Sequence, residues 1–118
     1  MTFDSLLRLA FWAALCFAFV MAVLPHPPQM PGDPSDKIQH ILAFTVLSGL
    51  AGAAFRSSPL LAIGIRLSAF GALIEVVQAI PALHRDSSAL DWLADTGAVL
   101  VVLILAALIR RARRIGSS

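Results

Sequence analysis

Four long apolar segments alternate with short polar or proline-rich stretches along the 118-residue chain. A helix needs about 20 mainly apolar residues to cross the hydrocarbon core of a bilayer, with a range of about 17–25. The four segments meet this requirement, and they predict spanning helices over about 6–24, 37–55, 60–80 and 91–109. We therefore expect an all-α membrane protein, a bundle of four transmembrane helices that forms a single domain over residues 1–118.

The stretches between the predicted helices contain residues that end or begin helices. Residues 25–36 read PHPPQMPGDPSD, and five prolines exclude a continuous helix there. Ser35 or Asp36 is predicted to cap the second helix, Pro81 ends the third, and Asp91 is well placed to cap the fourth. The apolar part of the first segment exceeds the 7–15 residues of an ordinary signal peptide, so we expect an uncleaved helix.

The composition supports a membrane setting. Hydrophobic residues make up 58% of the chain and the mean hydropathy is +0.84, more than a single soluble core of this size can bury. The single cysteine, Cys16, cannot form an intrachain disulfide, and no Cys/His motif has zinc-binding spacing, so the motifs predict neither a metal nor a cofactor. The net charge of +2 comes largely from the tail RRARR, which favours membrane lipids over nucleic acid as a partner.

The positive residues also predict an orientation. With four spans both termini lie on one side of the membrane, and that side would hold most of the arginines, whereas only Lys37 and Arg85 lie on the other. The positive-inside rule then predicts that both termini are cytoplasmic. The arginines on the cytoplasmic side would be Arg8, Arg56, Arg110, Arg111, Arg113 and Arg114.

Polar residues gather at the opposite, outward ends of the predicted helices. Three pairs of these residues each share one helix face, because the members of a pair are three or four residues apart. The pairs are Lys37 with His40, Glu75 with Gln78, and Asp91 with Asp95. An ionised side chain that faces lipid is costly, so these residues are expected to face the bundle interior or a watery pocket. The plainer reading assigns them to helix caps, headgroup anchors and ion pairs. The candidate polar pocket comprises Asp36, Lys37, His40, Glu75, Gln78, Arg85, Asp91 and Asp95.

The ordered pattern over residues 36–98 resembles the VanZ-like membrane proteins. It reads Asp36-Lys37-x-x-His40-x-x-x-Phe44, Glu75-x-x-Gln78, Pro81, Arg85, Asp91 and Asp95-x-Gly97-Ala98. Members of that family often carry Asn at the position of Asp95. The resemblance implies a multi-pass protein of the bacterial cytoplasmic membrane that is linked to the cell envelope and to low-level resistance to the glycopeptide teicoplanin. It implies no particular reaction.

Three classes of function fit these residues. The first is a binding site for an envelope lipid or cell-wall-related ligand, in which Lys37, His40 and Arg85 hold a phosphate or carboxylate. The second is an enzyme that acts on a lipid-linked or peptidoglycan precursor, with His40 or Glu75 as base and Arg85 as charge stabiliser. One version of it has an oxygen-and-nitrogen metal site, for which the candidates are His40, Glu75, Asp91 and Asp95. The third is a small transporter or assembly module, although the first predicted span lacks the acid that small multidrug exporters carry there.

Stripes of small residues predict close helix packing. Ser48 and Gly52, Gly64 with Ser68 and Ala72, and Ala94 with Ala98 each follow a four-residue spacing along one helix face. In lipid, such stripes let helix backbones approach closely. They predict a compact antiparallel bundle and offer faces through which the chain can oligomerise.

Overall fold

A computed structural model describes residues 2–24, 36–83 and 88–117, apart from the side chains of Asp36 and Ser117. These residues contain four long helices, α1 (Phe3–Val23), α2 (Asp36–Ala54), α3 (Leu60–Gln78) and α4 (Ala89–Ser117), and a short 3-10 helix, η1 (Pro81–Leu83). Each of the four long helices is long and apolar enough to cross a membrane. The described part of the chain has no strand, so the predicted all-α class with four spanning helices is confirmed.

The helix boundaries differ from the predicted ones mainly at the two ends of the chain. α1 begins three residues earlier than expected and so includes Asp4, which forms an ion pair with Arg56. α4 continues to Ser117, well past residue 109. The basic tail extends this helix because arginine is a good helix former and positive charge is favourable near a helix C-terminus.

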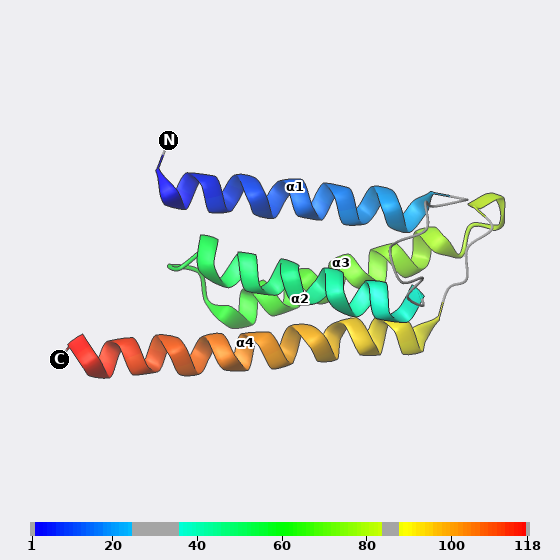
Figure 1. Cartoon of the computed structure of the whole chain (residues 1–118). Helices are drawn as coiled ribbons and strands as arrows, with labels where there is room; N and C mark the ends of the chain where they lie inside the picture. The colour runs from blue at the N-terminus through cyan, green and yellow to red at the C-terminus, as the bar shows by residue number, and fades with distance from the viewer. Residues whose placement is uncertain (1, 25–35, 84–87, 118) are drawn as a thin grey trace.

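Consecutive helices run antiparallel, and both termini lie at the same end of the bundle (Figure 1). α2 and α3 are central, α1 packs against both from one side, and α4 packs more extensively against both from the other. The turn between α2 and α3 lies at the end that holds the termini. The start of α2, the end of α3 and the start of α4 therefore meet at the opposite end.

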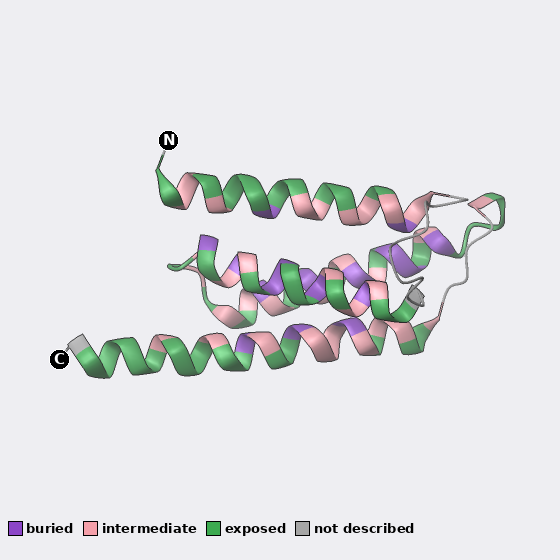
Figure 2. Cartoon of the chain, viewed as in Figure 1, coloured by how far each residue is buried: buried purple, intermediate pink, exposed green. Residues whose placement is uncertain are grey.

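The core lies between the central helices, and the outer faces are apolar. Phe44, Leu47, Ile74 and Val99 are each at most 2% exposed. Figure 2 shows that buried positions concentrate on α2 and α3 and on the faces of α1 and α4 that turn toward them. The outward faces of the helices are also apolar, and Leu61, for example, is 76% exposed. Helices that are apolar on all faces are typical of membrane spans.

Close helix approaches occur at two glycines of α3. A Cβ added at Gly64 would lie 3.1 Å from Leu103 Cδ1 of α4, and one added at Gly71 would lie 3.3 Å from Phe44 Cζ of α2. Ser68, one turn after Gly64, shares a hydrogen bond of 3.0 Å with Thr96 of α4. The small-residue stripe along α3 thus serves packing within this bundle.

Arginines tie the helices together at the end that holds the termini. Arg110 of α4 donates hydrogen bonds to the carbonyl oxygens of Ser58 at 2.9 Å, Gly52 at 3.1 Å and Phe55 at 3.3 Å. Gly52 lies in the last turn of α2, where carbonyl oxygens lack helix N–H donors, whereas Phe55 and Ser58 belong to the turn that follows the helix. Arg8 of α1 donates to the carbonyl oxygen of Ala54 at 3.3 Å, so α1 and α4 are both fastened to this end of α2.

Candidate functional site

Four buried polar residues lie near the opposite end of the bundle. His40 belongs to the second turn of α2, Glu75 and Gln78 to the end of α3, and Asp95 to the second turn of α4; their exposed fractions are 7%, 8%, 1% and 1%. At a rise of 1.5 Å per residue, His40, Glu75 and Asp95 lie about 6, 4.5 and 9 Å inside their helix ends. The three helices therefore carry ionisable groups to similar depths just inside the bundle.

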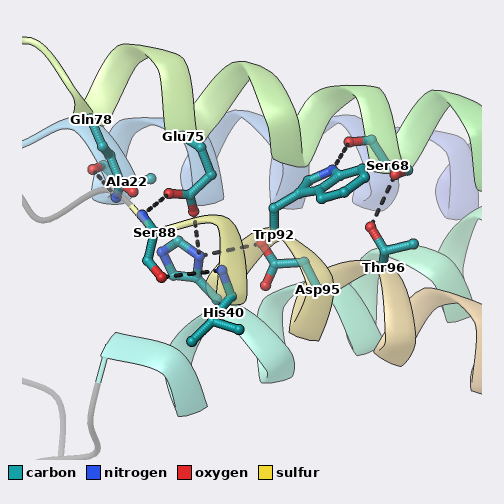
Figure 3. Close-up of polar contacts among 10 residues, drawn as sticks. Ala22, His40, Ser68, Glu75, Gln78, Ser88, Trp92, Asp95 and Thr96 are labelled. Atoms are coloured by element: carbon teal, nitrogen blue, oxygen red, sulfur yellow. Dashed lines mark hydrogen bonds and ion pairs between the residues drawn. The ribbon is translucent and has the colours of Figure 1, made fainter.

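The imidazole of His40 faces two carboxylates. Its Nδ1 atom lies 3.4 Å from Oδ2 of Asp95 and 3.9 Å from Oε1 of Glu75, and Figure 3 shows the three side chains converging from their helices. One ligand atom from each of the three residues lies within 4.8 Å of the others. Among the described residues, this cluster has the residue types and spacing of a candidate metal site. We call His40, Glu75 and Asp95 the buried triad.

Ser88 orients one member of the buried triad. Its backbone N–H donates a 2.8 Å hydrogen bond to Oε2 of Glu75, which leaves Oε1 on the side of His40. Ser88 also precedes the first residue of α4, and its hydroxyl accepts a 3.2 Å hydrogen bond from the N–H of Leu90. Ser88 rather than Asp91 therefore caps α4, and the predicted cap was wrong because the helix begins two residues before Asp91.

The role of Ser88 was missed, although a sequence signal existed. Serine is among the preferred N-cap residues, and here an acidic residue follows three positions later, as in a capping box. That signal places a helix start at Ser88. It carries no information about Glu75, which lies on another helix.

Gln78 connects the site to α1. Its Nε2 donates a 2.9 Å hydrogen bond to the carbonyl oxygen of Ala22, near the end of that helix. Its other polar atom, Oε1, is buried and accepts no hydrogen bond from the described residues, and the same holds for Oδ1 of Asp95. Buried acceptors are rarely left unsatisfied in folded proteins, so each marks a position where a donor or a cation is favourable.

The wall beneath the buried triad is apolar and firmly held. Phe44, one turn after His40, is 1% exposed. Trp92 of α4 donates from Nε1 to the carbonyl oxygen of Ser68 at 3.0 Å, which fixes its ring next to the close approach at Gly71. This packing places an apolar layer between the polar cluster and the middle of the bundle.

The structure brings together half of the predicted pocket. His40, Glu75, Gln78 and Asp95 are buried near one another, whereas Lys37 is exposed and Asp91 is half-buried, one turn nearer the end of α4. Arg85 and the side chain of Asp36 lie outside the described residues. Of the four metal-ligand candidates in the enzyme hypothesis, the structure groups His40, Glu75 and Asp95. No motif spacing marks them, because they belong to three different helices.

The fold and the site together define a class, a multi-pass α-helical membrane protein with a buried, ionisable polar cluster near one end of a four-helix bundle. The chain matches no family model, no curated protein and no solved structure at a significant level. The resemblance to VanZ-like proteins therefore stays a prediction from the sequence pattern.

Proposed function

We propose that this chain is a VanZ-like protein of the bacterial cytoplasmic membrane that binds an envelope lipid or cell-wall-related ligand at its polar pocket. The observation that carries the proposal is the convergence of His40, Glu75, Gln78 and Asp95 from three helices at one end of the bundle. Polar residues are expensive at this depth in a membrane and usually mark a functional site. A purely structural role would not require two buried acceptor atoms that no described donor reaches.

The polar groups at this end favour a ligand that combines two kinds of group. The acceptors Gln78 Oε1 and Asp95 Oδ1 suit hydroxyl, amide or ammonium donors, such as those of a sugar or a short peptide. Lys37, exposed on the same helix face as His40 and nearer the end of α2, suits a phosphate at the water boundary. Lipid-linked cell-wall precursors present both kinds of group, with an apolar chain for the surrounding lipid.

The distribution of arginines supports an outward-facing pocket. Arg8, Arg56 and Arg110 lie at the end of the bundle that holds both termini, and the buried triad lies at the other end. If the positive-inside rule holds for this chain, the pocket faces the outer side of the cytoplasmic membrane. An envelope precursor that has been translocated would be accessible there, which agrees with the implied link to glycopeptide resistance.

The test is lipid analysis of the full chain purified in mild detergent. Wild type should retain a phosphate-containing envelope lipid, and Lys37→Ala should retain much less of it because the phosphate loses its cationic partner. Arg111→Ala removes an exposed cation from the opposite end and should retain as much as wild type. Equal retention by all three proteins, or retention of bulk phospholipid alone, contradicts the proposal.

A second candidate function is catalysis on the same class of ligand. The observation that favours it is the position of His40 Nδ1, 3.4 Å from a carboxylate oxygen of Asp95. A carboxylate beside one imidazole nitrogen orients the ring and stabilises its protonated form, which suits a general base. Wild type in vesicles made from bacterial lipid extract should then generate a product that mass spectrometry does not find with His40→Gln, whereas binding alone generates none.

A further inference from the structure

We infer that the buried triad of His40, Glu75 and Asp95 binds a divalent transition-metal ion, with Zn²⁺ the best match. The inference rests on the proposed function only in placing the functional site at this end of the bundle. Metal binding needs no organic ligand, so the two proposals can fail separately. The donor set of one imidazole nitrogen and two carboxylate oxygens suits zinc and its first-row neighbours, whereas calcium and magnesium prefer oxygen ligands alone.

The distances among the three ligand atoms leave room for a bridging ion. A charge-assisted N–H···O bond is about 2.7–2.9 Å long, but His40 Nδ1 lies 3.4 Å from Asp95 Oδ2 and 3.9 Å from Glu75 Oε1. Two ligands bound tetrahedrally to zinc at about 2.1 Å are about 3.4 Å apart. The His40–Asp95 separation already has that value, and the His40–Glu75 separation exceeds it by about half an ångström.

The charge of the buried triad points the same way. Glu75 and Asp95 are both buried, and an ionised carboxylate in such a place is destabilising unless a positive charge compensates it. A divalent ion supplies two positive charges, one for each carboxylate. Oδ1 of Asp95, in a residue only 1% exposed, accepts no hydrogen bond from the described residues and is available for metal binding or for a metal-bound water.

Neighbouring groups prepare the ligands for a metal ion. The N–H of Ser88 holds one oxygen of Glu75 and so aims the other at the centre of the triad. Hydrogen bonds of this kind orient metal ligands and strengthen binding. The apolar wall around Phe44 lowers the local dielectric, and this strengthens the attraction between a cation and the carboxylates. Three protein ligands leave a fourth position for water or for a ligand group, which is the arrangement of a catalytic rather than a structural zinc site.

The experiment measures metal binding by the full-length protein in detergent, with the metal alone as the probe. Wild type loaded with Zn²⁺ and passed over a desalting column should retain about one equivalent by elemental analysis, and Co²⁺ should give the intense visible absorption of a tetrahedral site. Asp95→Asn preserves the shape of the side chain and removes its charge. Loss of a hydrogen-bond partner of a metal ligand lowers metal affinity by about 10–100-fold. The metal affinity of Asp95→Asn should fall by more than this, because the variant changes a ligand itself.

Asp4→Asn is the control, because it makes the same change at the opposite end of the bundle and should bind metal like wild type. His40→Gln is the second ligand variant, and size-exclusion profiles and helical circular dichroism identify which variants fold. Metal binding by folded His40→Gln or Asp95→Asn at the wild-type affinity overturns the inference, as does wild-type protein that retains no metal. Lipid retention is measured on the same samples, so wild-type protein that retains lipid but no metal refutes the metal site and leaves the proposed function intact.

Discussion

Replacement of Gly71 by leucine tests whether the close contact among α2, α3 and α4 holds the bundle together. A Cβ at this position would lie 3.3 Å from Phe44 Cζ, 3.4 Å from Trp92 Cδ1 and 3.5 Å from Phe44 Cε1. These neighbours are aromatic rings held from two sides, so they have little room to move. The remaining atoms of a leucine side chain would have to displace Phe44 or push α3 away from both partners.

The magnitude follows from two opposing effects. Extra methylene groups in a well-packed core cost about 1–3 kcal/mol. Leucine is a better helix former than glycine, which returns about 0.8 kcal/mol. Gly71→Leu should therefore lower the free energy of unfolding by up to about 2 kcal/mol, and by more if the helices separate.

Gly49→Leu separates these two effects. A Cβ at Gly49 of α2 would meet no atom within 4 Å, so this variant gains the same helix propensity without the clash. The two variants should differ by about 1–3 kcal/mol, the cost of overpacking alone. The assay is reversible unfolding in mixed micelles with increasing sodium dodecyl sulfate, followed by tryptophan fluorescence. Equal unfolding midpoints for the two variants would refute the reasoning, because the contact at Gly71 would then carry no stability.

Three further predictions concern the two ends of the bundle. Arg110→Ala should destabilise the protein by about 1–3 kcal/mol in the same unfolding assay, since it leaves three carbonyl oxygens without their charged donor. Arg111→Ala, at an exposed position, should have little effect, and similar losses in both would show that Arg110 contributes only charge. Ser88→Ala should cost about 0.5–2 kcal/mol and Ser88→Gly a few tenths, as at other helix N-caps; an Ala variant as stable as wild type would exclude the cap. A reporter enzyme that works only in the cytoplasm should be active when fused to either terminus, because both termini are predicted to be cytoplasmic. Activity of a reporter that works only outside the cytoplasm, at either terminus, would contradict the predicted orientation.

The four helices could be predicted from the chain because length and apolarity are local properties. A bilayer accepts a segment when about 20 consecutive residues are apolar, and this can be read without knowledge of what the segment packs against. The predicted ends of α2 and α3 were accurate to within two residues, since prolines and the RSSP turn interrupt the helices there. The end of α4 was misplaced because the tail is helical yet too polar to be counted as part of a span.

The candidate site was predictable only in part. Spacing placed Glu75 and Gln78 on one face of α3, and topology placed that end of α3 beside the starts of α2 and α4. The structure brings three of the residues that these arguments named together, His40, Glu75 and Asp95, and it buries Gln78 one turn after Glu75. The same arguments did not distinguish the less buried Lys37 and Asp91 from the buried residues of the site. The rotation of a helix about its own axis decides which residues are buried, and residue spacing alone does not give that rotation.

The sequence by itself thus determined the class of the protein, its four spanning helices and the end of the bundle at which polar residues gather, since hydropathy and charge act through local contact with lipid and water. Only the tertiary structure decided which of those residues face one another. The pairing of His40 with Asp95 joins residues 55 positions apart, and the hydrogen bond from Ser88 to Glu75 depends on where α4 begins. Both depend on packing at Gly64 and Gly71, where side chains from separate helices set the distance and rotation of α3.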